Sequence, residues 1–262
     1  KGPASVLYGR GSSGGLINRI TKKPGGNFSE VGLTLGRWNQ RRGEFDLARA
    51  PEGSVVSYRL TGAVERADSY RDQQFLDRKA LAASVLIKPS ADTSVLLQAD
   101  YLKDSRLTDF GIPAYQGRPV NVAPGTYYGA ANARDVDVSR AEVASLGATL
   151  NHRISDSLSL RNAFRYYDYS LERSNTLVGS VNEKAMTASL TRGNLQRDES
   201  GFFNQTELTQ KLELAGMKHQ LLYGFEFGRQ SKELISYSRA NVATVSLLNP
   251  VLPTLPLRID GK

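Results

Sequence analysis

The sequence contains no cysteine among its 262 residues, which excludes disulfide bonds and thiolate metal sites. It also has no apolar run of about 18 residues, and this excludes a membrane-spanning helix but not a transmembrane barrel, whose strands alternate apolar and polar residues. Only two histidines occur, His152 and His219, and neither lies near a cysteine or an acidic pair at the spacing of metal ligands. We therefore expect neither a metal site nor a cofactor.

A glycine-rich segment, Gly9 to Gly15, offers no familiar catalytic or nucleotide site either. It lacks the lysine and hydroxyl residue that end a phosphate-binding loop, and no strand precedes it. Ser13 matches the nucleophile elbow by letters alone, because it has neither a preceding strand nor a convincing histidine partner. These points argue against nucleotide binding and against a serine hydrolase, so we expect that the protein is not an enzyme.

The net charge of +8, with a pI of about 9.6, raises the question of nucleic-acid binding. Part of the excess lies in the first 23 residues, and the remaining basic residues are scattered singly among acidic ones. A nucleic-acid interface needs a basic stripe or patch, which this distribution does not provide. We therefore expect no nucleic-acid partner.

From residue 28 onward, apolar and polar residues alternate with a period of two, as in β-strands whose two faces meet different environments. In 55–66, for example, Val56, Tyr58, Leu60 and Val64 form one apolar face. The same alternation recurs in 79–88, 94–104 and 220–228. No segment with helical periodicity competes with these runs, so the sequence predicts an all-β protein.

We predict nine strands, at residues 29–37, 41–49, 55–66, 79–88, 94–104, 140–153, 158–172, 186–214 and 218–230. Their connections alternate between short turns and the longer segments 67–78, 105–139 and 173–185. This alternation and the strand lengths favour an antiparallel transmembrane β-barrel over a soluble sandwich, which also has alternating strands. Aromatic residues near strand ends suit the girdles at the membrane surfaces, namely Trp38, Tyr166, Tyr167 and Tyr169.

The segment from Gly2 to Pro24, GPASVLYGRGSSGGLINRITKKP, resembles the closing part of the plug domain in TonB-dependent outer-membrane siderophore receptors. Two later segments resemble barrel strands of the same receptors: 56–62, VSYRLTG, and 217–224, MKHQLLYG. The segment 248–251, LNPV, resembles an asparagine-proline stretch that follows the second of them. The matches follow the family order over nearly the whole chain.

The resemblance implies a location in the cell outer membrane and a two-part organisation. Residues 1–27 would be the C-terminal end of the plug domain, and residues 28–262 the N-terminal part of the barrel, about nine of the family's roughly 22 strands. Because Lys1 lies inside the plug motif and no closing strand follows 248–251, we expect an internal fragment of a longer receptor. The signal peptide and the segment that contacts TonB would lie outside it. The lack of cysteine suits passage through an oxidising periplasm.

The resemblance also implies a function, which is binding of a ferric siderophore and its import into the periplasm by plug movement coupled to the TonB complex. The ligand needs aromatic walls and a few polar donors. Tyr8 matches a tyrosine at the plug apex of such receptors, and Arg10 follows it. The loop 105–139 carries Phe110-Gly111-Ile112, where related receptors have a second aromatic residue in place of isoleucine. The expected ligand contacts are Tyr8, Arg10, Phe110, Tyr115, Tyr127 and Tyr128.

Charged residues are expected to hold the plug to the barrel wall. Arg19, Lys22 and Lys23 lie near the plug's exit into the first strand, where wall acids could receive charge-assisted hydrogen bonds. The candidate acids are Glu44, Asp46, Glu65, Glu207 and Glu226, and we select Arg19, Glu65 and Glu226 as contacts.

Two alternatives to a siderophore receptor stay open. One is a passive, porin-like channel in the outer-membrane lipid, in which the N-terminal segment is incidental. The other is a receptor of the same family whose cargo is haem, cobalamin or another molecule.

Overall fold

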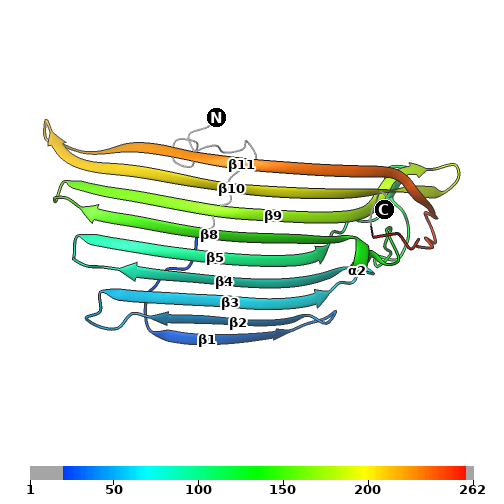
Figure 1. Ribbon diagram of the computed structural model, residues 1–262, viewed down its shortest axis with the longest axis horizontal. Helices are drawn as coiled ribbons and strands as arrows, with labels where there is room; N and C mark the ends of the chain where they lie inside the picture. The colour runs from blue at the N-terminus through cyan, green and yellow to red at the C-terminus, as the bar shows by residue number, and fades with distance from the viewer. Residues whose placement is uncertain (1–19, 258–262) are drawn as a thin grey trace.

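The computed structural model describes residues 20–257, which form an open nine-stranded sheet in the order β1-β2-β3-β4-β5-β8-β9-β10-β11 (Figure 1). Each strand pairs antiparallel with its neighbours. The prediction of nine antiparallel strands is thus confirmed. Their bounds are β1 (Phe28–Leu35), β2 (Arg41–Arg49), β3 (Val56–Asp68), β4 (Phe75–Ile87), β5 (Thr93–Leu107), β8 (Val138–Arg153), β9 (Leu158–Asn182), β10 (Thr187–Leu214) and β11 (Met217–Ser246).

The two ends of the sheet differ. Short turns join the strands at one end, between β2 and β3, β4 and β5, β8 and β9, and β10 and β11. The opposite end carries the long loop between β5 and β8, which contains the small hairpin of β6 (Ala114–Tyr115) and β7 (Arg118–Pro119) and the short helix α2 (Ala133–Val136) (Figure 1). We call this the loop end. None of the helices in residues 20–257 has the length and apolar character needed to cross a membrane.

One face of the sheet is apolar. A row of partners in register joins Tyr58, Val85, Leu97, Ala148 and Phe164 across five strands. Residues paired in register share a face, so this whole row points to the same side. The β1 side chains at 31, 33 and 35 on this face are more than 80% exposed. Such an extended, exposed apolar surface matches the lipid-facing side of a transmembrane barrel.

The opposite face is polar. A second row joins Asp46, Thr61, Ala82, Asp100 and Ser145 by register. These residues alternate with those of the apolar row, because successive side chains of a strand point to opposite sides. The charged residues that were expected to meet the plug lie on this polar face.

The alternation also corrects the prediction of an aromatic girdle at 166–169. Tyr166 lies in register with Leu146 on the apolar face. Tyr167 points to the polar face, where its hydroxyl donates to Glu199 Oε1 at 2.9 Å. Tyr169 lies on the polar face too, and the guanidinium of Arg197 covers its ring at 5.3 Å. Neighbouring tyrosines on one strand cannot all face the membrane surface.

Two strands continue much further than the alternation predicts. β9 and β11 are 25 and 30 residues long, so residues 173–182 are strand and not loop, and β11 does not end at 230. The 28 residues of β10 agree with the predicted strand at 186–214. The additional segments depart from a simple apolar and polar alternation because the loop end is packed on a cluster of its own. Ala188 and Leu190 of β10 are fully buried there, against Tyr128, Val245 and Leu247.

The long loop and the segment after β11 fold against each other at the loop end. The Tyr128 hydroxyl donates to the carbonyl oxygen of Leu247 at 2.5 Å. Asn132 exchanges two hydrogen bonds with the backbone of Leu255, at 2.9 and 3.0 Å. We call residues 120–137 and 247–257 together the loop cap.

A buried arginine on β10 fixes the loop cap. Arg192 donates to the carbonyl oxygens of Val136, Pro256 and Leu257, and its Nε lies 3.5 Å from Asp137 Oδ1. The side chains of Arg192 and Asp137 are 3% and 1% exposed. Burial raises the pKa of the Asp137 carboxyl, against the opposing effects of Thr176 and Arg192. One guanidinium therefore joins the start of β8, β10 and the end of the described chain.

Candidate functional site

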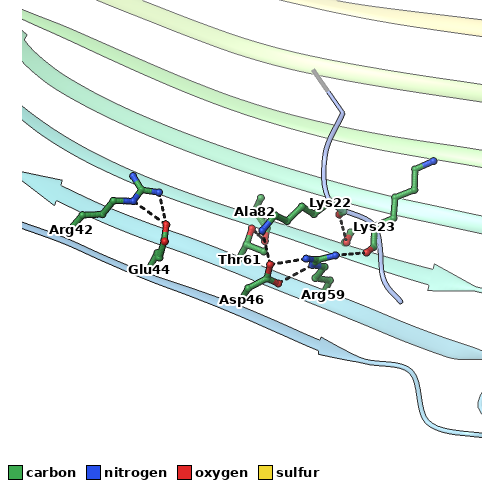
Figure 2. A network of polar contacts seen from close by, with 9 residues as sticks. Lys22, Lys23, Arg42, Glu44, Asp46, Arg59, Thr61 and Ala82 are labelled. Atoms are coloured by element: carbon green, nitrogen blue, oxygen red, sulfur yellow. Dashed lines mark hydrogen bonds and ion pairs between the residues drawn. The ribbon is translucent and has the colours of Figure 1, made fainter. Parts of the chain in front are cut away.

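The segment that enters β1 crosses the polar face of the sheet and is tied to it by charge (Figure 2). Lys22 Nζ lies 2.6 Å from Asp46 Oδ2. Asp46 stands on β2, and its side chain is 9% exposed, whereas that of Lys22 is 61% exposed. The wall therefore supplies a shielded carboxylate, and the incoming segment supplies an exposed ammonium group.

Arg59 on β3 completes this contact. Its Nε and Nη2 donate to the two carboxylate oxygens of Asp46 at 2.8 and 2.7 Å, and its Nη1 donates to the carbonyl oxygen of Lys23 at 3.2 Å. Ser84 on β4 donates to the carbonyl oxygen of Lys22 at 3.0 Å. A bidentate arginine that shares its partner with a lysine stabilises the contact more than an isolated surface ion pair would. We call Lys22, Asp46, Arg59 and Ser84 the tether.

The last residue before β1 is fixed as well. Asn27 Nδ2 donates to the carbonyl oxygen of Ala50, and Ala50 N donates to Asn27 Oδ1 at 2.7 Å. This reciprocal pair joins the entry of β1 to the end of β2. Residues 22–27 are therefore held at both of their ends.

The tether overlaps only in part with the predicted plug contacts. Arg19 lies outside the described residues. Glu65 lies on the polar face but accepts from Gln40 Nε2 at 3.2 Å and from Arg42 Nη1 at 3.1 Å, within the wall. Arg42 also donates twice to Glu44 (Figure 2). Lys22 and Asp46 were among the candidates, whereas the role of Arg59 escaped sequence reasoning, because only the register brings it beside Asp46.

Glu226 lies in a cavity of about 270 Å³ on the polar face. The cavity is also lined by Thr21 of the entering segment and by Arg165 and Phe203 of the wall. Glu226 and the entering segment therefore line the same cavity.

The two adjacent loop tyrosines are buried in the loop cap. Tyr127 is 6% exposed and packs against Ala130, Ala133 and Leu255. Tyr128 is 3% exposed and belongs to the cluster around Leu190. Burial raises the pKa of both hydroxyl groups above the ordinary tyrosine value. These positions favour a role in holding the loop over direct contact with a ligand.

The remaining predicted ligand contacts differ in accessibility. Phe110 is 48% exposed in the long loop. Tyr115 in β6 packs at the edge of the loop cap, and its hydroxyl accepts from Gln116 Nε2 at 3.2 Å. Tyr8 and Arg10 lie outside the described residues.

The chemistry available on the polar face is that of binding and of holding segments in place. Within residues 20–257, no three histidine, aspartate or glutamate side chains gather as metal ligands. The charged residues instead form pairs that run across neighbouring strands, such as Arg78 with Asp104 at 2.8 Å and Arg161 with Glu207 at 3.1 Å.

Comparison with known proteins places this wall in a family. The model of the TonB dependent receptor-like β-barrel matches residues 82–259, which is more than half of the chain. The metal-pseudopaline receptor CntO of Pseudomonas aeruginosa is 31% identical over 96% of this chain and 36% of its own length. The ferrioxamine receptor of Yersinia enterocolitica is 26% identical over 95% of this chain and 34% of its own length. The chain thus spans about a third of these relatives.

Solved structures show the same fold. The siderophore receptor PiuA of Acinetobacter baumannii superposes with a TM-score of 0.86 at 23% identity, covering 97% of this chain and 40% of PiuA. The ferric-catecholate import receptor Fiu of E. coli K12, in its open form, gives 0.83 at 21% identity, covering 97% of this chain and 42% of Fiu. Together with the family match, the open sheet and its apolar face lead to one assignment. The chain belongs to the TonB-dependent receptor-like β-barrel family of outer-membrane proteins.

Proposed function

We propose that the complete protein is an outer-membrane receptor that binds a ferric siderophore and imports it into the periplasm by TonB-coupled movement of its plug. The family is one of receptors and transporters and not of enzymes. The relatives that cover nearly all of this chain are named as receptors for metal-pseudopaline and ferrioxamine. The ferric form of the cargo and the coupling to TonB are the parts that we infer for this protein.

The observation that carries the proposal is the path of residues 20–27 over the polar face. We infer that residues 1–27 are the end of a plug domain and that residues 28–262 begin the barrel. The tether supports this division, since it holds the segment before β1 against the side of the sheet that would face a lumen. Plug movement would then start from a segment fixed to the wall at Asp46.

We further propose that Tyr8, Arg10, Phe110 and Tyr115 contribute to ligand contact. The exposure of Phe110 supports this role. Tyr127 and Tyr128 would act by fixing the shape of the loop that carries Phe110 and Tyr115. Arg19 and Glu226 stay proposed contacts between plug and wall, and Glu65 would act through its partner Arg42.

The test is uptake of radiolabelled iron, delivered as a panel of defined siderophores, by cells with and without the complete gene and with and without TonB. Uptake of one chelate that needs both the gene and TonB is the expected result. Uptake that needs the gene but not TonB would instead indicate a passive channel. Labelled haem and cobalamin in the same panel identify a different cargo, and the absence of uptake of any ferric chelate would refute the ferric siderophore assignment.

A further inference from the structure

A second cavity, of about 550 Å³, opens at the loop end of the polar face. It lies between the β1–β2 turn, the β3–β4 turn and the end of β5, away from the tether. Its volume is in the range of small-molecule sites. Its lining combines aromatic rings and arginines with engaged acids, and includes Arg37, Trp38, Glu65, Asp68, Phe75 and Arg106. We call it the Trp38 pocket.

Trp38 is held in an unfavourable backbone conformation. Trp38 and Asn39 have φ angles of 53° and 55°, and the Gly36 N to Gln40 O hydrogen bond closes the hairpin around them. Two left-handed residues are what such a tight turn requires, and asparagine tolerates this conformation whereas a bulky residue does not. Strained residues of this kind concentrate at functional sites. The hairpin therefore presents a bulky aromatic residue in a conformation that such residues rarely adopt.

Burial of the side chain does not explain why a tryptophan occupies this turn position. The Trp38 side chain, the only tryptophan of the chain, is 51% exposed. Its ring meets Tyr70 edge-on, with centroids 6.1 Å apart, and Tyr70 is itself 53% exposed. An indole face at the mouth of a pocket is suited to stacking with a planar ligand.

The walls of the pocket are fixed without a ligand. Arg71 is buried and donates to Asp109 Oδ2 at 2.7 Å and to the carbonyl oxygen of Thr126 at 2.8 Å. Arg134 of α2 donates to Asp68 Oδ1 at 2.7 Å, and its guanidinium covers the ring of Phe75. These contacts join the β3–β4 turn, the end of β5 and the loop cap. A preformed site loses little ordering entropy when it binds.

The pocket favours negative charge. Its acids are already engaged: Asp68 by Asn39 and Arg134, and Glu65 by Arg42 and Gln40. Asp109 is likewise engaged by Arg71.

The arginines of the pocket, in contrast, are not fully neutralised by its acids. The guanidinium of Arg37 has no ion pair among residues 20–257. Arg106 donates through Nε and Nη2 to the two oxygens of Asp104, and Arg78 also pairs with this carboxylate, so two guanidinium groups face a single negative charge. An ionised oxygen group would therefore find arginine donors beside the exposed indole.

We propose that the Trp38 pocket binds a planar anion, namely an aromatic ring that carries ionised carboxylate or catecholate oxygens. The ring stacks on Trp38, and the oxygens are bound by Arg37 and Arg106. The inference rests on the proposed function, since such a ring would be an arm of the chelator that arrives from outside. The pocket then acts as an entry site at the rim, before the cargo reaches the plug.

The test is calorimetric titration of the full-length receptor in detergent with 2,3-dihydroxybenzoate, and with neutral benzamide as the comparison ligand. Trp38→Asn is the decisive variant, because asparagine suits the left-handed turn while removing the indole. We expect Trp38→Asn and Arg37→Gln each to weaken dihydroxybenzoate binding about tenfold, the size of one charge-assisted or stacking contact. Trp38→Asn should at the same time raise the melting temperature.

The matched control is Arg118→Gln, an exposed arginine of the same loop end outside the pocket, which should bind as the wild type does. Absence of dihydroxybenzoate binding to the wild type, binding unchanged in Trp38→Asn and Arg37→Gln, or equal binding of benzamide would overturn the proposal.

The uptake experiment separates this inference from the proposed function. TonB-dependent uptake with an unchanged KM in Trp38→Asn would support the proposed receptor function and contradict the role of the Trp38 pocket as an entry site. Binding of dihydroxybenzoate that depends on Trp38, in a protein that takes up no ferric chelate, would keep the pocket and reject the cargo.

Discussion

The ring of Phe45 on β2 lies across Gly62, its partner in register on β3. A Cβ atom added at Gly62 would overlap the ring at Cε1 and Cζ. The glycine therefore lets an aromatic side chain lie flat over the apolar face, where it shields the backbone between two strands. Glycine is required here for space and not for an unusual backbone angle.

Gly62→Ala should destabilise the receptor by about 0.5–1.5 kcal/mol, because the part-exposed Phe45 ring must leave its rotamer to make room for the methyl group. Thermal unfolding of the full-length protein in detergent measures it. Gly43→Ala is the matched control, because a Cβ at Gly43 on the same face meets its nearest atoms at an ordinary 3.8 Å. Gly62→Ala combined with Phe45→Leu should recover most of the loss. Equal melting temperatures for the two alanine variants would contradict this account.

Asp46→Asn should loosen the segment before β1. The change leaves Arg59 without its carboxylate partner, at a cost of about 1–3 kcal/mol for a hydrogen-bonded charged group. With a cysteine placed at Thr21, and any cysteine outside these 262 residues replaced by serine, maleimide labelling at position 21 should become severalfold faster. Asp77→Asn, which breaks the exposed pair with Arg66, should leave the labelling rate unchanged. Equal labelling rates for Asp46→Asn and Asp77→Asn would show that the tether does not hold the segment before β1.

Arg192→Leu should release the loop cap. It removes three bonds to carbonyl oxygens and leaves Asp137 buried without its positive partner, which typically costs about 3–5 kcal/mol. Hydrogen exchange in 247–257 should accelerate, whereas Arg153→Leu, in an exposed pair at the opposite end, should have little effect. The double variant Arg192→Leu with Asp137→Leu should be less destabilised than Arg192→Leu alone. Additive losses in this cycle would argue against coupling of the pair.

The stability of the loop end should depend on pH through Asp137. Burial raises the pKa of its carboxyl in the folded protein above the unfolded value. The folded state therefore binds the proton more tightly, and the stability from this group is present below the unfolded pKa and lost as the pH rises through the folded pKa. The melting temperatures of the wild type and Asp137→Asn should agree at low pH. As the pH rises, the melting temperature of the wild type should drop below that of Asp137→Asn. A constant difference would show that the carboxyl does not titrate there.

The sequence predicted the wall well and its junctions poorly. The period of two located all nine strands, since both the apolar row at Leu97 and the polar row at Asp100 follow from alternation. It failed at 173–182 and for β11 beyond residue 230, because Val178 and Val245 pack on a cap that only distant parts of the chain can form. Strand ends that rest on long-range packing leave no local periodic signal.

The candidate sites divide in the same way. That a base near Lys22 would meet a wall acid follows from charge and position, but the choice of Asp46 depends on the register between β2 and β3. Trp38 resisted prediction for another reason. Of the two turn residues only Asn39 signals a left-handed conformation, so the strained tryptophan emerges from the backbone angle alone.

The length of β9, β10 and β11 determines how far this part of the barrel extends beyond the membrane. A strand of 28 residues is about 90 Å long at roughly 3.3 Å per residue, and tilted by about 45° it rises some 65 Å. The apolar band of an outer-membrane barrel is about 25 Å tall. These strands therefore extend well beyond the lipid as a continuous sheet. Because the longer loops of such barrels lie on the extracellular side, a molecule that approaches from outside would meet the ends of these strands before it met the membrane.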